Sequence, residues 1–96
     1  MRLFLITLLF ALPAFLLAQA KLEQLAHLPF PNETLAGCWH YANQAGKEYA
    51  LVGTSKGLSI VDVSNPKKPF LRYQIPMPNS NWREIKTWKD FAYVVT

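Results

Sequence analysis

The residues that could do chemistry are few in this chain of 96 residues, and their spacing supports little catalysis. Cys38 and His40 form a Cys-x-His pair, but a structural zinc site needs about four ligands. Asp62 precedes a Val-Ser-Asn-Pro stretch, where its carboxylate could bind a cation or accept hydrogen bonds from the turn backbone. We favour the second role, because it explains the residue type without a ligand. We therefore predict no catalytic residue, no metal site and no cofactor.

The candidates for binding a ligand are Trp39, His40, Trp82 and Arg83. His40 and Arg83 each follow a tryptophan, so the sequence predicts equivalent positions for them in two successive repeats. If the strands that carry them are innermost, both side chains could face a central channel and contact a ligand. The tryptophan rings could stack on sugar rings, although large aromatics more often pack between sheets. Cys38 is the single cysteine, and we expect it to be buried as a small apolar side chain.

An internal repeat must position these residues. The segment from Lys47 to Thr54 aligns with the segment from Lys89 to Thr96 at an offset of 42 residues, and the similarity fails only at Gly53 against Val95. Trp39 and Trp82 extend the match at an offset of 43. A period of about 42 residues is typical of four-stranded propeller blades and of paired-helix repeats.

Short apolar runs between turn residues favour strands over paired helices. Two of the runs are separated by Ser55-Lys56-Gly57, which predicts a hairpin with a three-residue turn containing glycine. There, Gly57 is expected to adopt a left-handed conformation. Seven prolines and the absence of helical periodicity after about residue 28 argue against helices. The predicted fold class is all-β, with strands over residues 49–54, 58–63, 70–75 and 82–88.

The N-terminus has the features of a cleavable secretory signal peptide. Arg2 supplies a positive charge, residues 3–17 are apolar except for Thr7, and Ala18-Gln19-Ala20 fits the signal peptidase cleavage site. The alternative is an uncleaved membrane anchor, but the apolar run is shorter than the ~20 residues of a spanning helix. We predict a signal-peptide helix over residues 1–20, cleavage after Ala20, and a secreted or cell-surface location.

Charge limits the class of partner. The formal net charge is +4, and the basic residues are scattered, with Lys67-Lys68 the only basic pair. Because nucleic-acid binding needs a clustered basic face, we expect no nucleic-acid partner. The membrane is expected to be contacted only transiently, through the signal peptide.

Two stretches of the chain resemble a known family. The run Tyr49-Ala-Leu-Val-Gly-Thr54, followed by Gly57-Leu-Ser-Ile-Val-Asp-Val-Ser-Asn-Pro66, resembles the LVIvD repeat. The runs Trp82-Arg-Glu-Ile-Lys86 and Ala92-Tyr-Val-Val95 resemble the choice-of-anchor B family that is built from such repeats. The resemblance covers about residues 35–96.

This resemblance implies a β-propeller exported by bacteria, with a non-catalytic binding or scaffolding role and an unidentified extracellular protein or carbohydrate as partner. The runner-up is part of an extracellular propeller enzyme, a glycoside hydrolase or lyase, with catalytic residues beyond residue 96. The expected organisation is a signal peptide over residues 1–20, a lead-in segment over 21–34, and a partial propeller over 35–96. These repeats amount to fewer than two blades, so we expect the chain to be the N-terminal part of a longer protein.

Overall fold

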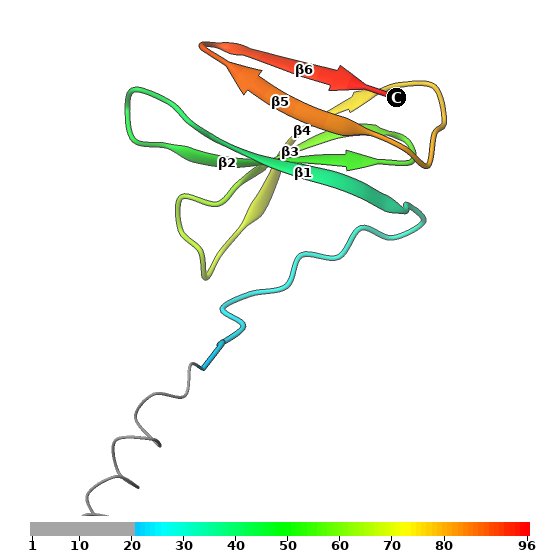
Figure 1. Cartoon of the computed structure of the whole chain (residues 1–96). Helices are drawn as coiled ribbons and strands as arrows, with labels where there is room; N and C mark the ends of the chain where they lie inside the picture. The colour runs from blue at the N-terminus through cyan, green and yellow to red at the C-terminus, as the bar shows by residue number, and fades with distance from the viewer. Residues whose placement is uncertain (1–20) are drawn as a thin grey trace, which may run out of the picture.

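The computed structural model describes residues 21–96 (Figure 1). The predicted signal-peptide helix over residues 1–20 lies outside the described residues. Across residues 21–96, the structure contains no helix with the length and apolar character needed to cross a membrane. The strands are β1 (Leu35–Ala42), β2 (Glu48–Thr54), β3 (Gly57–Asp62), β4 (Phe70–Pro76), β5 (Glu84–Trp88) and β6 (Phe91–Val95).

The strands form two antiparallel sheets, which confirms the all-β prediction. The first sheet has the order β1-β2-β3-β4, so each strand pairs with its neighbours along the chain. The second sheet is the hairpin β5-β6, which lies across β1 and β2 (Figure 1). The predicted runs at residues 49–54, 58–63 and 70–75 agree with β2, β3 and β4 to within one residue at each end. The fourth predicted run begins at residue 82, whereas β5 begins at Glu84.

The turn between β2 and β3 is tighter than the sequence predicts. Thr54 pairs with Gly57, so the turn has two residues, Ser55 and Lys56, and Gly57 is the first residue of β3. The φ angle of Gly57 is 151°, which is positive as expected but more extended than the left-handed helical value of about 57°. A Cβ at Gly57 would collide with the carbonyl oxygen of Ile75 on β4. Glycine is needed there for close approach of the backbones as well as for its φ angle.

Two facing glycines let the second sheet approach the first. Gly37 on β1 pairs with Gly53 on β2. A Cβ at Gly37 would lie 2.5 Å from the carbonyl oxygen of Arg83, and one at Gly53 would lie 2.9 Å from the Cβ of Arg83. Because neither glycine has a side chain, the chain entering β5 rests directly on the first sheet.

A small core lies between the sheets. Leu51, Leu58 and Ile85 form a buried cluster, and each keeps 5% or less of its surface exposed. Burying an aliphatic side chain of this size contributes about 1.5–3 kcal/mol, so these three hold the sheets together. The half-buried residues that pack around them are Tyr41, Ile60, Met77 and Val94.

The register of the two hairpins corrects the predicted repeat alignment. The turn between β1 and β2 spans five residues, from Asn43 to Lys47, whereas the turn between β5 and β6 has only two. His40 pairs with Ala50, whose repeat counterpart Ala92 pairs with Thr87. The structural counterpart of His40 is therefore Thr87, and the predicted equivalence with Arg83 is wrong. The shorter turn places equivalent positions of β1 and β5 at an offset of 47 residues, so the tryptophan match at an offset of 43 is coincidental.

Candidate ligand-binding groove

The lead-in segment, residues 21–34, is fastened to the turn between β2 and β3. The backbone N–H of Thr34 donates to Oγ of Ser55 at 3.1 Å, and the backbone N–H of Ser55 donates to the carbonyl oxygen of Thr34 at 2.8 Å. The hydroxyl of Thr54 donates to Oε1 of Glu33 at 2.7 Å. Just before this clamp, Asn32 has a φ angle of 64°, which asparagine tolerates better than most residues. The lead-in is thus held at its C-terminal end.

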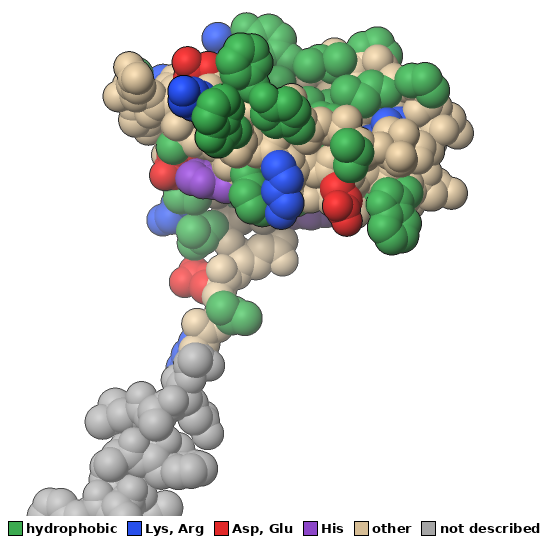
Figure 2. All heavy atoms as spheres, turned by 45° about the horizontal axis from the view of Figure 1, so that its top comes forward, with side chains coloured by type: hydrophobic (Ala, Val, Ile, Leu, Met, Phe, Trp, Pro, Cys, Tyr) green, Lys and Arg blue, Asp and Glu red, His purple; other side chains and the backbone are tan. Residues whose placement is uncertain are grey.

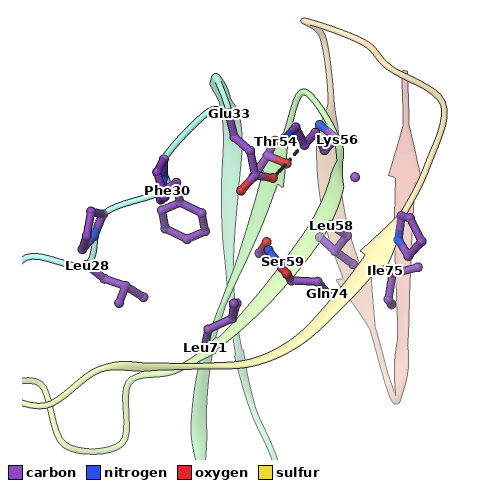
Figure 3. Close-up of a pocket in the computed structure, with 14 residues that line it drawn as sticks. Leu28, Phe30, Glu33, Thr54, Lys56, Leu58, Ser59, Leu71, Gln74 and Ile75 are labelled. Carbon is purple, nitrogen blue, oxygen red and sulfur yellow. Dashed lines mark hydrogen bonds between the residues drawn. The ribbon is translucent and has the colours of Figure 1, made fainter.

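A groove opens between the lead-in and the first sheet, on the side away from β5 and β6 (Figure 3). Its volume is about 680 Å³, within the range of about 300–1,000 Å³ that is usual for small-molecule sites. The labelled side chains Phe30 and Leu28 come from the lead-in, and Leu71 and Gln74 come from β4 (Figure 3). The lining residues are Leu28, Pro29, Phe30, Pro31, Glu33, Thr54, Lys56, Gly57, Leu58, Ser59, Leu71, Gln74, Ile75 and Pro76.

Polar groups occupy one part of this mostly apolar lining. Thr54 and Ser59 are 1% and 2% exposed. Ser59 pairs with Gln74 across the ladder, so a hydroxyl and an amide stand side by side on the groove wall. Glu33 and Lys56 add one charge of each sign near Thr54 (Figure 3). Apolar walls with a few convergent donors and acceptors suit a ligand that stacks or packs and also makes hydrogen bonds.

The structure gives Arg83 a structural role. Arg83 is 1% exposed, and its Nε donates to the carbonyl oxygen of Thr54 at 2.6 Å. Its Nη2 donates to the carbonyl oxygen of Pro78 and, at 3.3 Å, to that of Ser55. Nη1 lies 3.6 Å from the sulfur of Met77. These contacts join the β2–β3 turn to the connection before β5, and they account for the guanidinium without any ligand.

The other three predicted binding residues are dispersed. Trp39 donates from Nε1 to Oγ1 of Thr87 at 3.0 Å, and Nζ of Lys86 lies 3.8 Å from the centre of the ring. Nε2 of His40 lies 3.9 Å from Oε1 of Glu48. Trp82 is 67% exposed. None of these residues lines the groove, and the structure does not bring them together into one site.

Two further predictions at single residues have opposite outcomes. Cys38 is exposed, so the expectation of a buried cysteine is wrong. It lies on β1 between Gly37 and Trp39, and its side chain points away from the second sheet because successive strand residues alternate faces. Asp62 caps its turn as predicted, since its Oδ1 accepts the backbone N–H of Ser64 at 2.9 Å. The hydrogen bonds from Ser64 hold the pKa of Asp62 below its ordinary value.

The groove residues of the lead-in were missed by the sequence interpretation. The signal was the run Leu28-Pro29-Phe30-Pro31, in which apolar residues alternate with prolines that cannot join a ladder. Such a run stays extended and keeps its apolar side chains available for a neighbouring surface. Nothing in its sequence, however, indicates which surface that is.

Two further observations concern ionisable side chains elsewhere in residues 21–96. Within residues 21–96, no cluster of three or more His, Cys, Asp or Glu side chains could hold a metal ion. At the tip of β5–β6, the hydroxyl of Tyr41 donates to Oδ1 of Asp90 at 3.3 Å. Desolvation and this hydrogen bond raise the pKa of Tyr41.

Comparison with known families identifies the repeat. Residues 46–75, which span β2, β3 and most of β4, match the LVIVD repeat. Comparisons with curated proteins and with solved structures found no match.

Proposed function

Because this chain carries an LVIVD repeat at residues 46–75, we propose that it is a non-catalytic binding module of an exported, propeller-type protein. The observation that carries the proposal is the groove between the lead-in and the first sheet. Its apolar walls and its hydroxyl, amide and charged groups are those of a recognition site. Its ligand is an extracellular protein segment or a carbohydrate.

The propeller part of the proposal is supported by how the two sheets meet. The hairpin β5–β6 packs face to face on the first sheet, and its second strand repeats the sequence of β2. Repeated sheets that each cover the face of the previous one are the basis of radial stacking. The family resemblance noted in the sequence, to choice-of-anchor B proteins, is consistent with such an assembly.

Ligand screening tests the groove directly. The full chain would be mixed with neutral oligosaccharides, acidic oligosaccharides and proline-containing extended peptides, and binding would be followed by backbone amide shifts in NMR spectra. Shifts of the amides of Leu28, Phe30, Glu33 and Gln74 are expected for a ligand in the groove. Hydrolysis of an oligosaccharide during the titration would favour the alternative function, that of a glycoside hydrolase or lyase.

Matched variants separate this groove from the site predicted by sequence. Gln74→Ala and Phe30→Ala remove groove groups, and His40→Ala and Trp82→Ala remove exposed groups outside it. Loss of one polar partner costs about 1–3 kcal/mol, and loss of a buried aromatic side chain costs about 1.5–3 kcal/mol, so both groove variants should weaken binding about tenfold or more. If His40→Ala and Trp82→Ala weakened binding while the groove variants did not, the ligand would bind at the other surface.

Export is a separate part of the proposal. The predicted signal peptide, residues 1–20, supports it. Expression of the full reading frame in a bacterial host, with N-terminal sequencing of the exported product, should give a chain that begins at Lys21. An intact chain that starts at Met1 and stays in the cytosol would exclude export.

A further inference from the structure

Two polar side chains on the wall of the groove have no partner within the protein. Ser59 on β3 is 2% exposed and pairs across the ladder with Gln74 on β4. Thr54 is hydrogen-bonded to Glu33 and to the backbone of Lys56, but within residues 21–96 no hydrogen bond reaches the side chain of Ser59 or Gln74 (Figure 3). No polar side-chain atom that is shielded from solvent lacks a partner in this part of the chain, so the Ser59 hydroxyl opens on the groove.

An aromatic ring lies on the other wall of the groove. Phe30 projects from the lead-in into the groove (Figure 3), and the prolines on either side of it favour an extended lead-in. On the sheet, Leu71 and Ile75 of β4 are 42% and 45% exposed. All of these groups belong to residues 28–76, so the groove is built without β5 and β6. It combines an aromatic face with a hydroxyl and an amide.

The backbone around the groove offers few hydrogen bonds to a ligand. β2 and β3 are paired on both edges, so their N–H and C=O groups are used within the first sheet. In the lead-in, Pro29 and Pro31 have no N–H. A peptide brings a donor and an acceptor at every residue, and most of them would be buried here without a partner. A ligand whose polar groups are met by side chains fits this groove better.

The charges of the groove balance. Glu33 and Lys56 contribute one charge of each sign, and the other lining residues are uncharged. A ligand with a large net charge would be attracted by one of these groups and repelled by the other. A neutral ligand with many hydroxyls can donate to the carboxylate and accept from the ammonium group. Neutral saccharides have this chemistry, with hydroxyls around the rim of each ring and C–H groups on its faces.

We propose that the groove binds a neutral oligosaccharide, an inference that rests on the binding role proposed above for the same groove. A sugar ring packs its C–H face on the ring of Phe30. Adjacent hydroxyls of the saccharide hydrogen-bond to Gln74, whose amide accepts from one and donates to the next, and to Ser59, whose hydroxyl can do both. Glu33 and Lys56 bind further hydroxyls at the end of the groove beside Thr54 (Figure 3).

The test titrates the full chain with three neutral tetrasaccharides, cellotetraose, maltotetraose and N-acetylchitotetraose, and separately with a peptide of alternating proline and leucine. Calorimetry measures affinity, and proton NMR follows the sugar. The expected result is saturable binding of at least one tetrasaccharide, with upfield shifts of its C–H protons caused by the ring of Phe30. Affinity should change by less than about twofold between about 0.05 and 0.5 M salt, because a neutral ligand forms no ion pair that salt can screen.

Variants of the chain assign the contacts. Phe30→Leu keeps an apolar side chain but removes the ring, so it should abolish the upfield shifts and weaken binding about fivefold. Gln74→Ala should weaken binding about tenfold. The matched control is Gln44→Ala, at an exposed glutamine between β1 and β2, which should leave affinity unchanged. Thermal melts of all three variants check that the fold is kept.

Three outcomes would overturn the saccharide proposal, and they differ in what they leave of the binding role. Binding of the peptide alone, with shifts of the groove amides, would keep the groove as a binding site and change its ligand. Saccharide binding that is equal in wild type, Phe30→Leu and Gln74→Ala would put the sugar on another surface and remove the groove from both proposals. No binding by any of the four probes would reject the saccharide as the ligand and leave the groove without support.

Discussion

Strands β2 and β6 have matching sequences and very different surroundings. Leu51 on β2 is 5% exposed, while its counterpart on β6, Tyr93, is 55% exposed. Gly53 is buried, while its counterpart Val95 is 58% exposed. Figure 2 shows hydrophobic side chains gathered at the top of the molecule, where β5 and β6 lie. The difference comes from neighbours: β2 is paired on both edges and covered by β5, and β6 is neither. A strand sequence therefore determines which surface can be buried, and the adjoining repeat determines whether it is.

The largest effect is expected when the side chains of the counterparts Leu51 and Tyr93 are each truncated to alanine. Leu51→Ala should cost about 2–5 kcal/mol, because it leaves a cavity between the sheets. Tyr93→Ala should change stability by about 0.5 kcal/mol or less, because its ring is exposed. Denaturant unfolding followed by circular dichroism would measure both. Equal effects would mean that β6 is covered in solution and that the contrast between the strands is false.

A second test removes the hydrogen bonds by which Arg83 links the first sheet to the β5–β6 hairpin. Arg83→Ala leaves the carbonyl oxygens of Thr54, Ser55 and Pro78 without their donor, and the expected loss is about 2–3 kcal/mol. The control is Arg72→Ala, on the exposed strand β4, which should be nearly neutral. Hydrogen exchange should show β5 and β6 losing protection while β3 and β4 keep theirs. Uniform loss of protection would indicate that the two sheets unfold as one unit.

A third test changes the turn between β2 and β3 in the first sheet. Gly57→Val should destabilise the first sheet by about 1–3 kcal/mol, because a β-branched residue is strained at this φ angle and its Cβ meets Ile75. Gly46→Val is a useful contrast, because that glycine has a positive φ angle of 82° but no atoms near its Cβ position. The melting temperature should fall for both, and further for Gly57→Val. A larger fall for Gly46→Val would show that φ strain, and not backbone approach, dominates.

The smallest expected effect is on how the melting temperature depends on pH, through Asp62. The folded-state pKa of Asp62 is lowered, so its ionised form stabilises the turn at neutral pH, and this contribution is lost as the pH falls below about 4. Asp62→Asn cannot titrate, so its melting temperature should depend less on pH in that range. Thermal melts between pH 7 and pH 3 would compare the two proteins. A wild type whose melting temperature fell no more than that of the variant would contradict the capping role.

The sequence predicted the local features of this fold well. Strand alternation and the turns around Ser55 and Asn65 are short-range signals, and β2, β3 and β4 appear where those signals place them. The role of Asp62 was also predicted, because its partner Ser64 is only two residues away. Each of these inferences needs information from a few neighbouring residues and no knowledge of packing.

The candidate site was predicted poorly, because its contacts are long-range. Arg83 reaches carbonyl groups 28 and 29 residues earlier in the chain, and no local pattern encodes that distance. The clamp between Thr34 and Ser55 likewise joins segments 21 residues apart. The alignment of Trp39 with Trp82 was misleading for another reason: a hairpin turn can lose residues while the strands beside it keep their register.

The paired glycines have a consequence for how such sequences can vary. Gly37 and Gly53 face each other on adjacent strands; Arg83 lies against both, and the side chain of Ile85 lies against Gly53. Replacing either glycine alone pushes against backbone or against a buried side chain. We therefore expect positions 37, 53, 83 and 85 to covary among chains that share this packing. A larger residue at position 53 should be accompanied by a smaller one at position 85. An alignment in which position 53 varies freely while position 85 stays large would argue against a common spacing of the sheets.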